Sequence, residues 1–237
     1  MASASELAVA TLQIIGVDVL LGGDNAVIIA LACRGLPPEH QKKAILFGTG
    51  GAIVIRSVLT VFAVVLLGLP FLKIIGSVLL LWIGAKLLIP QDEGHGEDGG
   101  SATNMWAAIR TIIIADLVMS IDNVLAVAAA AKDHAGLVVF GLLFSIPIIV
   151  WGSTMVIKLM DRFPITITIG AGLLGYIAGE MAVKDIVVAE WVNTNAHWLH
   201  YAAPAVGIVF VIAVGKALAA RKKPKVVEIH SQSHPKG

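Results

Sequence analysis

Charge is scarce in this sequence. Only 14% of its 237 residues are Asp, Glu, Lys or Arg, and the formal net charge is +1 at pH 7. Soluble domains carry about 25% charged residues, so the composition excludes an ordinary soluble fold. A net charge so close to zero identifies no partner, and no pattern of basic and aromatic residues predicts binding to nucleic acid.

Cysteine is almost absent, and so are the marks of a cleaved leader. The one thiol, Cys33, excludes an intrachain disulfide and argues against a thiolate metal cluster. The first apolar run follows Glu6, with no basic segment before it and no small-residue cleavage site leading into a soluble domain. We therefore expect this run to be a membrane span and not a signal peptide.

Long apolar runs are what the sequence has in abundance. Hydrophobic residues make up 57% of the chain, and the mean hydropathy is +0.89. These runs lack the alternation of a barrel strand, and lipid forces other spanning segments to be helical. The sequence predicts an all-α integral membrane protein with a single membrane domain, 1–237. We expect about seven spans, at 7–33, 44–68, 71–89, 105–131, 136–160, 165–183 and 201–220.

The basic residues predict an orientation in the bacterial cytoplasmic membrane. An outside N-terminus places most basic loop residues in the cytoplasm, where Lys and Arg are enriched in membrane proteins. The cytoplasmic set is then Arg34, Lys42, Lys43, Lys158, Arg162, Lys216, Arg221, Lys222, Lys223 and Lys225. The outer set is only Lys73, Lys132 and Lys184. The bias predicts a multi-pass protein whose C-terminus is cytoplasmic.

Two polar segments lie outside the predicted spans. The stretch 90–104 contains "QDEGHGEDGG", which is typical of a flexible solvated connector, although its acids could hold a divalent ion loosely. These side chains are Asp92, Glu93, His95, Glu97 and Asp98. The tail 221–237 begins "RKKPK", which we interpret as an anchor near anionic lipid.

One motif occurs twice. "DVLLGGDNAVIIAL" begins at residue 18 and "DLVMSIDNVLAVAA" begins at residue 116, and both contain Asp, five residues, then Asp-Asn. The likeness continues, because Phe47-Gly48 resembles Phe140-Gly141 and Gly76 aligns with Gly170. The sequence therefore predicts repeat one at 7–89 and repeat two at 105–185, with a seventh helix at 201–220.

The number of spans in each repeat determines how the two copies are oriented in the membrane. An odd number makes the second copy enter the membrane from the opposite side, which gives an inverted repeat. Inverted repeats place substrate sites near the bilayer midplane where the two halves meet. Both motifs fall at similar depth in their spans, so we expect them to meet there.

Carboxylates at this depth predict a bound cation. A charged side chain in the middle of a bilayer costs about 3 kcal/mol even on lenient scales, and buried polar residues that only join helices do not need that charge. Bound protons could also neutralise the excess of acid. The candidate metal ligands are Asp18, Asp24, Asn25, Asp116, Asp122 and Asn123, with Ser120, Met119, Glu180, Arg56 and Lys86 as possible accessory residues.

The sequence leaves two arrangements of these acids open. On a straight helix Asp18, Gly22 and Asn25 share one face, whereas Asp24 lies about 120° away. Either the helix opens at Gly22-Gly23, or the acids act at different distances from the ion. Oxygen ligands favour Mn²⁺, Mg²⁺ or Ca²⁺ over zinc or copper, and a thioether from Met119 would favour Mn²⁺.

The two motifs, "GGDNAVIIAL" and "SIDNVLAVA", resemble those of the TerC family of integral membrane proteins, in a lysine-exporter-like superfamily. The resemblance covers about 7–220, and the compact layout is similar to the YjbE-type branch. It implies a metal-ion exporter, most often of manganese, with no cofactor. The positions that it implies are Asp24, Asn25, Asp122 and Asn123, with Asp18 and Asp116 on the same helices.

Other functions stay open at this stage. An exporter of amino acids or another solute is the nearest competitor, and a non-transporting membrane partner in metal homeostasis is a second. An intramembrane aspartyl protease would need Gly-x-Gly-Asp, but the chain reads Leu21-Gly22-Gly23-Asp24. We therefore do not expect an enzyme. A homo-oligomer is compatible with the sequence.

Overall fold

The computed structural model describes residues 23–62, 65–66, 68–90, 99–131 and 135–221, and the side chains of residues 61, 99–103 and 122–145 lie outside that description. Over the described ranges every regular element is a helix and none is a strand. The expected all-α class is thus confirmed. Large apolar side chains such as those of Val54, Ile75 and Val209 are more than 60% exposed, as lipid-facing surfaces require.

The helices follow the predicted spans closely. They are α2 (Gly23–Cys33), α3 (Pro38–Val61), α5 (Leu72–Leu87), α6 (Gly99–Ala131), α7 (Ala135–Arg162), α8 (Ile165–Val183), α9 (Ala189–Asn195) and α10 (Leu199–Arg221). Among the described residues, four segments are long and apolar enough to cross a membrane: Pro38–Thr60, Asn104–Ile121, Ile165–Val183 and Leu199–Arg221. The count of seven spans stays a prediction.

Two helices begin before the spans predicted in them. Helix α3 begins at Pro38, ahead of the span predicted from 44, and α6 begins at Gly99, within the connector predicted at 90–104. The apolar segment of α6 begins at Asn104, next to the predicted start at 105. Hydropathy identifies only the apolar part of a helix. The helix itself extends into polar residues wherever the backbone hydrogen bonds continue. Proline suits the first turn of α3 because that position needs no N–H donor. The short helix α9 was not predicted.

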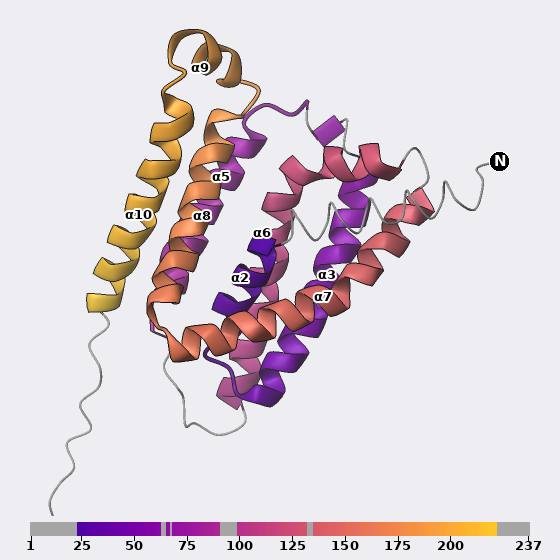
Figure 1. Cartoon of the computed structure of the whole chain (residues 1–237), viewed down its shortest axis with the longest axis vertical. Helices are drawn as coiled ribbons and strands as arrows, with labels where there is room; N and C mark the ends of the chain where they lie inside the picture. The colour runs from indigo at the N-terminus through magenta and orange to yellow at the C-terminus, as the bar shows by residue number, and fades with distance from the viewer. Residues whose placement is uncertain (1–22, 63–64, 67, 91–98, 132–134, 222–237) are drawn as a thin grey trace, which may run out of the picture.

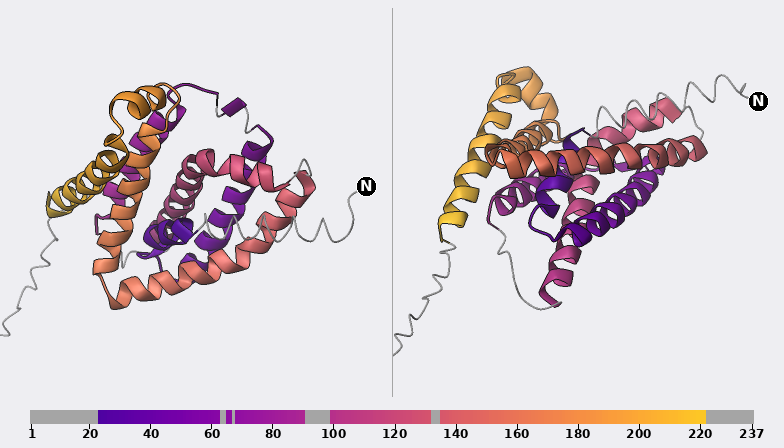
Figure 2. Two further views of the ribbon diagram at one scale, coloured as in Figure 1. Left: turned by 45° about the horizontal axis from the view of Figure 1, so that its top comes forward. Right: turned by 60° about the horizontal axis from the view of Figure 1, so that its bottom comes forward.

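The helices form two groups that pack side by side. Helices α5, α8 and α10 lie together on one side of the molecule, and α2, α3, α6 and α7 form the other group (Figure 1). The further views keep the same division (Figure 2). Contacts of α6 with α5 and of α2 with α8 join the groups, and the buried core between them includes Leu31, Leu80, Ile112 and Leu174.

The packing of the two motif helices is reciprocal. Helix α2 contacts α7 and α8, and α6 contacts α3 and α5. In the predicted repeat α2, α3 and α5 correspond to α6, α7 and α8, so each motif helix packs against the opposite half. A Cβ on Gly76 of α5 would lie 2.8 Å from Val118, and one on Gly170 of α8 would lie 2.8 Å from Val27. Two interlocked copies would pack in this way, although the repeat itself stays a prediction.

Helices α8 and α10 approach each other at glycines. A Cβ on Gly175 would lie 2.3 Å from the carbonyl oxygen of Gly207, and one on Gly179 would lie 2.2 Å from that of Ala203. Neither distance is possible for a real side chain. Small residues at membrane helix interfaces allow such backbone contact, which replaces the hydrophobic driving force that lipid removes.

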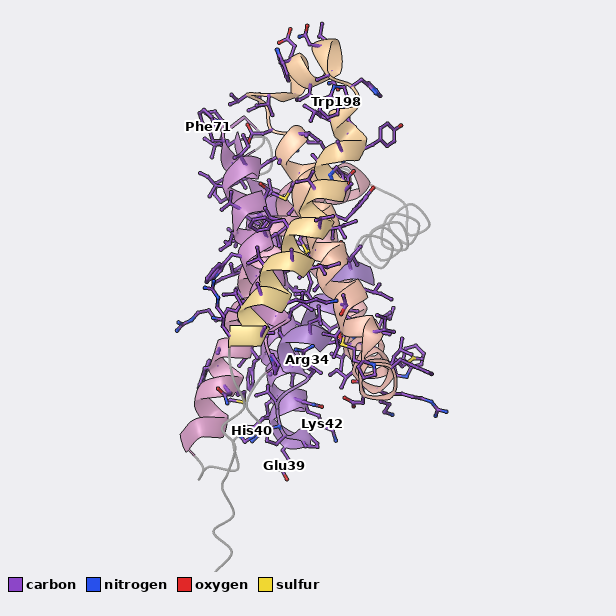
Figure 3. The ribbon with its side chains drawn as sticks, turned by 90° about the vertical axis from the view of Figure 1, so that its left-hand side faces the viewer. Arg34, Glu39, His40, Lys42, Phe71 and Trp198 are labelled. Atoms are coloured by element: carbon purple, nitrogen blue, oxygen red, sulfur yellow. The ribbon has the colours of Figure 1, made fainter. Side chains whose placement is uncertain are left out.

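Helix α5 is capped at both ends by side chains from other elements. At its N-terminal end, the buried Asp185 carboxylate accepts hydrogen bonds from the N–H groups of Phe71, Lys73 and Ile74 at 3.0–3.2 Å. At its C-terminal end, the Arg34 guanidinium donates to the carbonyl oxygen of Leu87 at 2.9 Å. Phe71 lies near one end of the molecule, and Arg34 lies toward the other end, above Glu39 and His40 (Figure 3). Each charge suits the helix dipole at its end.

Asp185 lies after α8 and outside the spans. Burial alone raises the pKa of its carboxyl, but the backbone N–H groups of Val187, Ile74, Phe71 and Lys73 outweigh burial and hold the pKa below its ordinary value of 3.8. Phe71 has a left-handed φ of 63°, a strained conformation for a residue other than glycine. The hydrogen bond from Phe71 to Asp185 fixes this turn.

Candidate metal site

Arg56, Asp116 and Ser120 form a buried polar cluster between α3 and α6. The Arg56 guanidinium donates from Nε to Ser120 Oγ at 2.9 Å and from Nη2 to Asp116 Oδ1, with which it forms an ion pair. Ser120 Oγ donates in turn to Asp116 Oδ2 at 3.2 Å. Exposure is 3% for Arg56, 7% for Asp116 and 0% for Ser120. The i, i+4 spacing of Asp116 and Ser120 places both on the face of α6 that meets α3.

This cluster explains how a charge can be held at depth. Removing a carboxylate from water costs several kcal/mol unless an opposite charge and further hydrogen bonds compensate. Asp116 has both, because Arg56 supplies the charge and Ser120 supplies a hydroxyl donor. The carboxylate is therefore compensated and fixed in orientation.

A small cavity lies beside the cluster, where α2, α3, α6 and α7 meet. Its volume is about 10 Å³, enough for one water molecule or one dehydrated ion. Its polar wall consists of Asn25, Thr49, Arg56 and Asp116. The apolar wall consists of Ile28, Ile29, Ala52, Ile53, Ile112 and Ile149. We call this space the Asn25–Asp116 cavity.

Two side chains that line the Asn25–Asp116 cavity are buried without a hydrogen-bond partner among the described residues. These are the amide of Asn25, at both Oδ1 and Nδ2, and the hydroxyl of Thr49. A buried polar group left unsatisfied costs about 1–3 kcal/mol. An amide oxygen and a hydroxyl oxygen beside a carboxylate are also the donor set that hard divalent ions prefer. The donors present therefore suit a cation.

Asp24 lies next to the cavity and not in its wall. Its Oδ1 accepts the backbone N–H of Asn25 at 2.9 Å, and its side chain is only partly buried. The first motif thus contributes Asn25 to the wall and a second carboxylate beside it.

Comparisons with known proteins identify the family of this chain. The family model described as "Integral membrane protein TerC family" matches residues 3–223. The chain belongs to the TerC family. It is 47% identical over 178 residues to the uncharacterized membrane protein YjbE of Bacillus subtilis (strain 168), covering 75% of this chain and 80% of the relative.

More distant TerC-family relatives also match. The chain is 25% identical to the uncharacterized membrane protein YkoY of Bacillus subtilis (strain 168), over 80% of this chain and 64% of the relative. It is 23% identical to the UPF0053 inner membrane protein YgdQ of Escherichia coli (strain K12), over 67% of this chain and 72% of the relative. No solved structure matches.

The other predicted ligands of this TerC-family chain lie at the limit of the description. Asp18 is outside the described residues, and Asp122 and Asn123 are placed on α6 by their backbone alone. Helix α6 is continuous through the second motif, so the chain does not open there. Among the described residues, no three of His, Cys, Asp and Glu gather into a metal-holding group.

Three predicted accessory residues lie elsewhere. Met119 is buried in the apolar core, and Glu180 forms an ion pair with Lys184 at 2.5 Å near the end of α8. Lys86 is exposed at the end of α5 and lines a separate groove. None of the three lines the Asn25–Asp116 cavity. Of the accessory set, Arg56 and Ser120 are the two that join the site.

Thr49 is the functional candidate that the sequence reasoning missed. It lies seven residues before Arg56 on α3, which is two helical turns, so both face α6 and the cavity. That spacing was a usable signal once Arg56 had been singled out. In the other half, the alignment of Phe47 with Phe140 pairs Arg56 with Ile149, which also lines the cavity. The positive charge of Arg56 therefore has no counterpart at the aligned position of the other predicted half.

Proposed function

We propose that this TerC-family protein exports a divalent metal ion, with Mn²⁺ favoured, across the bacterial cytoplasmic membrane. The observation that carries the proposal is the pair of buried oxygens of Asn25 and Thr49, which have no hydrogen-bond partner among the described residues and lie beside the Asp116 carboxylate. Asp24, directly before Asn25 in α2, adds a second carboxylate beside it. Asp18, Asp122 and Asn123 complete the proposed ligand set.

The chemistry of the cavity supports an inorganic cation over an organic solute. Its polar wall offers amide, hydroxyl and carboxylate oxygens, and its volume of about 10 Å³ matches one small ion. An amino acid would need a much larger chamber with an apolar pocket beside the charges. The proposal is therefore metal transport and not amino-acid export.

The proposed mechanism uses Arg56 as a competitor of the metal. In this structure the Arg56 guanidinium pairs with the Asp116 carboxylate and compensates its charge. A metal ion entering the cavity shares the Asp116 carboxylate and coordinates Asn25 and Thr49. Helices of both predicted halves line the cavity, so rocking of one half against the other exposes it to each side in turn.

The orientation belongs to this proposal. Glu39, His40 and Lys42 lie at one end of the molecule and Trp198 at the other (Figure 3). We place the Lys42 end and the C-terminus in the cytoplasm. In a C33A background, a membrane-impermeant thiol reagent applied to whole cells should label W198C and not K42C. Labelling of K42C alone would reverse the orientation.

Mn²⁺ flux in proteoliposomes tests the function. Wild type should carry Mn²⁺, and D116N and N25A should each abolish most of the flux. E180Q is the matched control, because it removes a carboxylate that pairs with Lys184 away from the cavity. N25A should fold even if D116N does not, because the Asn25 side chain makes no hydrogen bond to the described residues. Its flux therefore still tests the proposal. Equal flux in wild type and N25A, or wild-type protein that carries no metal ion, would contradict the proposal.

A further inference from the structure

A second cavity is much larger than the metal site and has different chemistry. It is an open groove of about 890 Å³ between α5, α6 and α10. Three cations line it: Lys86 near the end of α5, Arg110 in α6 and Arg221 at the end of α10. We call it the basic groove. Its apolar wall includes Leu79, Trp82, Ile83, Ile114 and Leu218.

The charge of the basic groove is not compensated within the described part of the chain. No carboxylate lines it. Lys86, Arg110 and Arg221 are all exposed, and neither ion pair of the described residues involves them. Like charges converging on one groove repel each other, so their placement suits an anionic occupant.

The surroundings of the groove indicate a lipid and not a soluble anion. Trp82 lies in its wall and Val78 lies close by on α5, and both are more than half exposed. Such apolar surface on a membrane helix faces acyl chains. Lys86 and Arg221 lie in the last turns of their helices, where anionic headgroups meet basic pockets between membrane helices, and Arg110 lines the same groove from within α6.

We propose that the basic groove binds an anionic phospholipid, with the phosphate at Lys86, Arg110 and Arg221 and an acyl chain along the wall beside Trp82. The lipid bridges α10, which is outside the predicted repeat, to α5 and α6. This site is separate from the metal cavity, so the inference does not depend on the proposed transport function.

Lipid binding to the purified full chain tests the inference. Native mass spectrometry should show wild type retaining phosphatidylglycerol in preference to phosphatidylcholine from mixed detergent micelles. The groove variant K86Q/R110Q/R221Q should lose this preference, with affinity for phosphatidylglycerol falling about fivefold for each charge removed. The matched control K42Q/K43Q/K158Q removes three exposed positive charges outside the groove and should retain the preference.

Several results would overturn the inference. One is equal retention of phosphatidylglycerol by the groove variant and the control. Another is displacement of the lipid by inorganic phosphate, which would indicate a site for a soluble anion. A third is lipid binding that appears only after Asp92, Glu93, Glu97 and Asp98 are neutralised, because the acidic connector would then be the occupant. If the triple variant does not fold, R110Q alone gives the same comparison.

Discussion

At the scale of single residues, substitution of Asn25 should affect stability and metal transport differently. Its buried amide has no hydrogen-bond partner among the described residues, so in the metal-free protein it costs free energy. We expect N25V to unfold at the same temperature as wild type or a higher one, while Mn²⁺ flux is lost. Thermal unfolding in detergent and flux in liposomes measure the two effects. A clear loss of stability would show that the amide has a structural partner.

Arg56 should behave in the opposite way. R56Q leaves the Asp116 carboxylate buried without the charge of Arg56, and removing one partner of a buried pair costs about 3–5 kcal/mol. R56Q should therefore unfold well below wild type, and R56Q/D116N should recover part of the loss. K216Q, which changes an exposed cation, is the control. If R56Q and K216Q unfold alike, the ion pair does not stabilise the fold.

The sequence could predict part of the site at this scale. Asp116, Ser120 and Asn25 followed from the doubled motif, because its spacing defines helix faces. Thr49 was not predicted, although its spacing of seven residues from Arg56 places the two on one face of α3. The partners of Glu180 and Lys86 depend on how the helices meet, and the structure places both outside the metal cavity.

At the scale of elements, Asp185 controls the start of α5. Its folded-state pKa lies below the ordinary value of 3.8, so the ionised cap stabilises the fold above that pH. The stabilisation is lost as pH falls through the lower folded-state pKa. We expect D185A to be less stable than wild type by about 0.5–2 kcal/mol at neutral pH. The difference should shrink in strong acid.

Unfolding temperatures of both proteins at neutral and at acidic pH measure this effect. D185N is the companion variant, because its amide oxygen still accepts a hydrogen bond but carries no charge. Its deficit should be smaller than that of D185A and should not depend on pH in the acidic range. A deficit of D185A that grows as pH falls would contradict the assignment.

The glycines of α8 give a second prediction at this scale. A Cβ at Gly175 would meet the backbone of Gly207 at 2.3 Å, whereas one at Gly172 would meet the side chains of Ile208 at 3.5 Å and Ile212 at 3.6 Å, which are ordinary contacts. G175A should separate α8 from α10 and lower the unfolding temperature by several degrees. G172A is the matched control and should be close to neutral. Equal stability of the two variants would show that α8 and α10 do not touch at Gly175.

Helix existence followed from the sequence, and helix ends did not. The apolar run of α8 ends where the helix ends, so 165–183 was predicted without error. The run of α6 is shorter than its helix, because Gly99 to Asn104 continue the backbone bonds in polar residues. Hydropathy indicates which residues face lipid or the core, but it does not show where the backbone hydrogen bonds of a helix end.

At the scale of the whole molecule, the two motif helices both connect the two halves of the fold and line the cavity of the proposed function. Each packs against the opposite half, and the Asn25–Asp116 cavity lies where α2 and α6 come together with α3 and α7. The doubled motif predicted that the halves meet. It could not predict that Arg56 from one half would occupy the site opposite Ile149, because that asymmetry is visible only in the packed structure.

Locating a bound Mn²⁺ ion tests the central claim most directly. Crystals of the full chain grown with Mn²⁺ would give an anomalous difference map at the manganese absorption edge. We predict one peak in the membrane interior, within coordination distance of Asn25 Oδ1 and an Asp116 oxygen, that disappears in N25A. A peak elsewhere, such as at the acidic connector, together with an Asn25–Asp116 cavity that holds only water, would contradict the account.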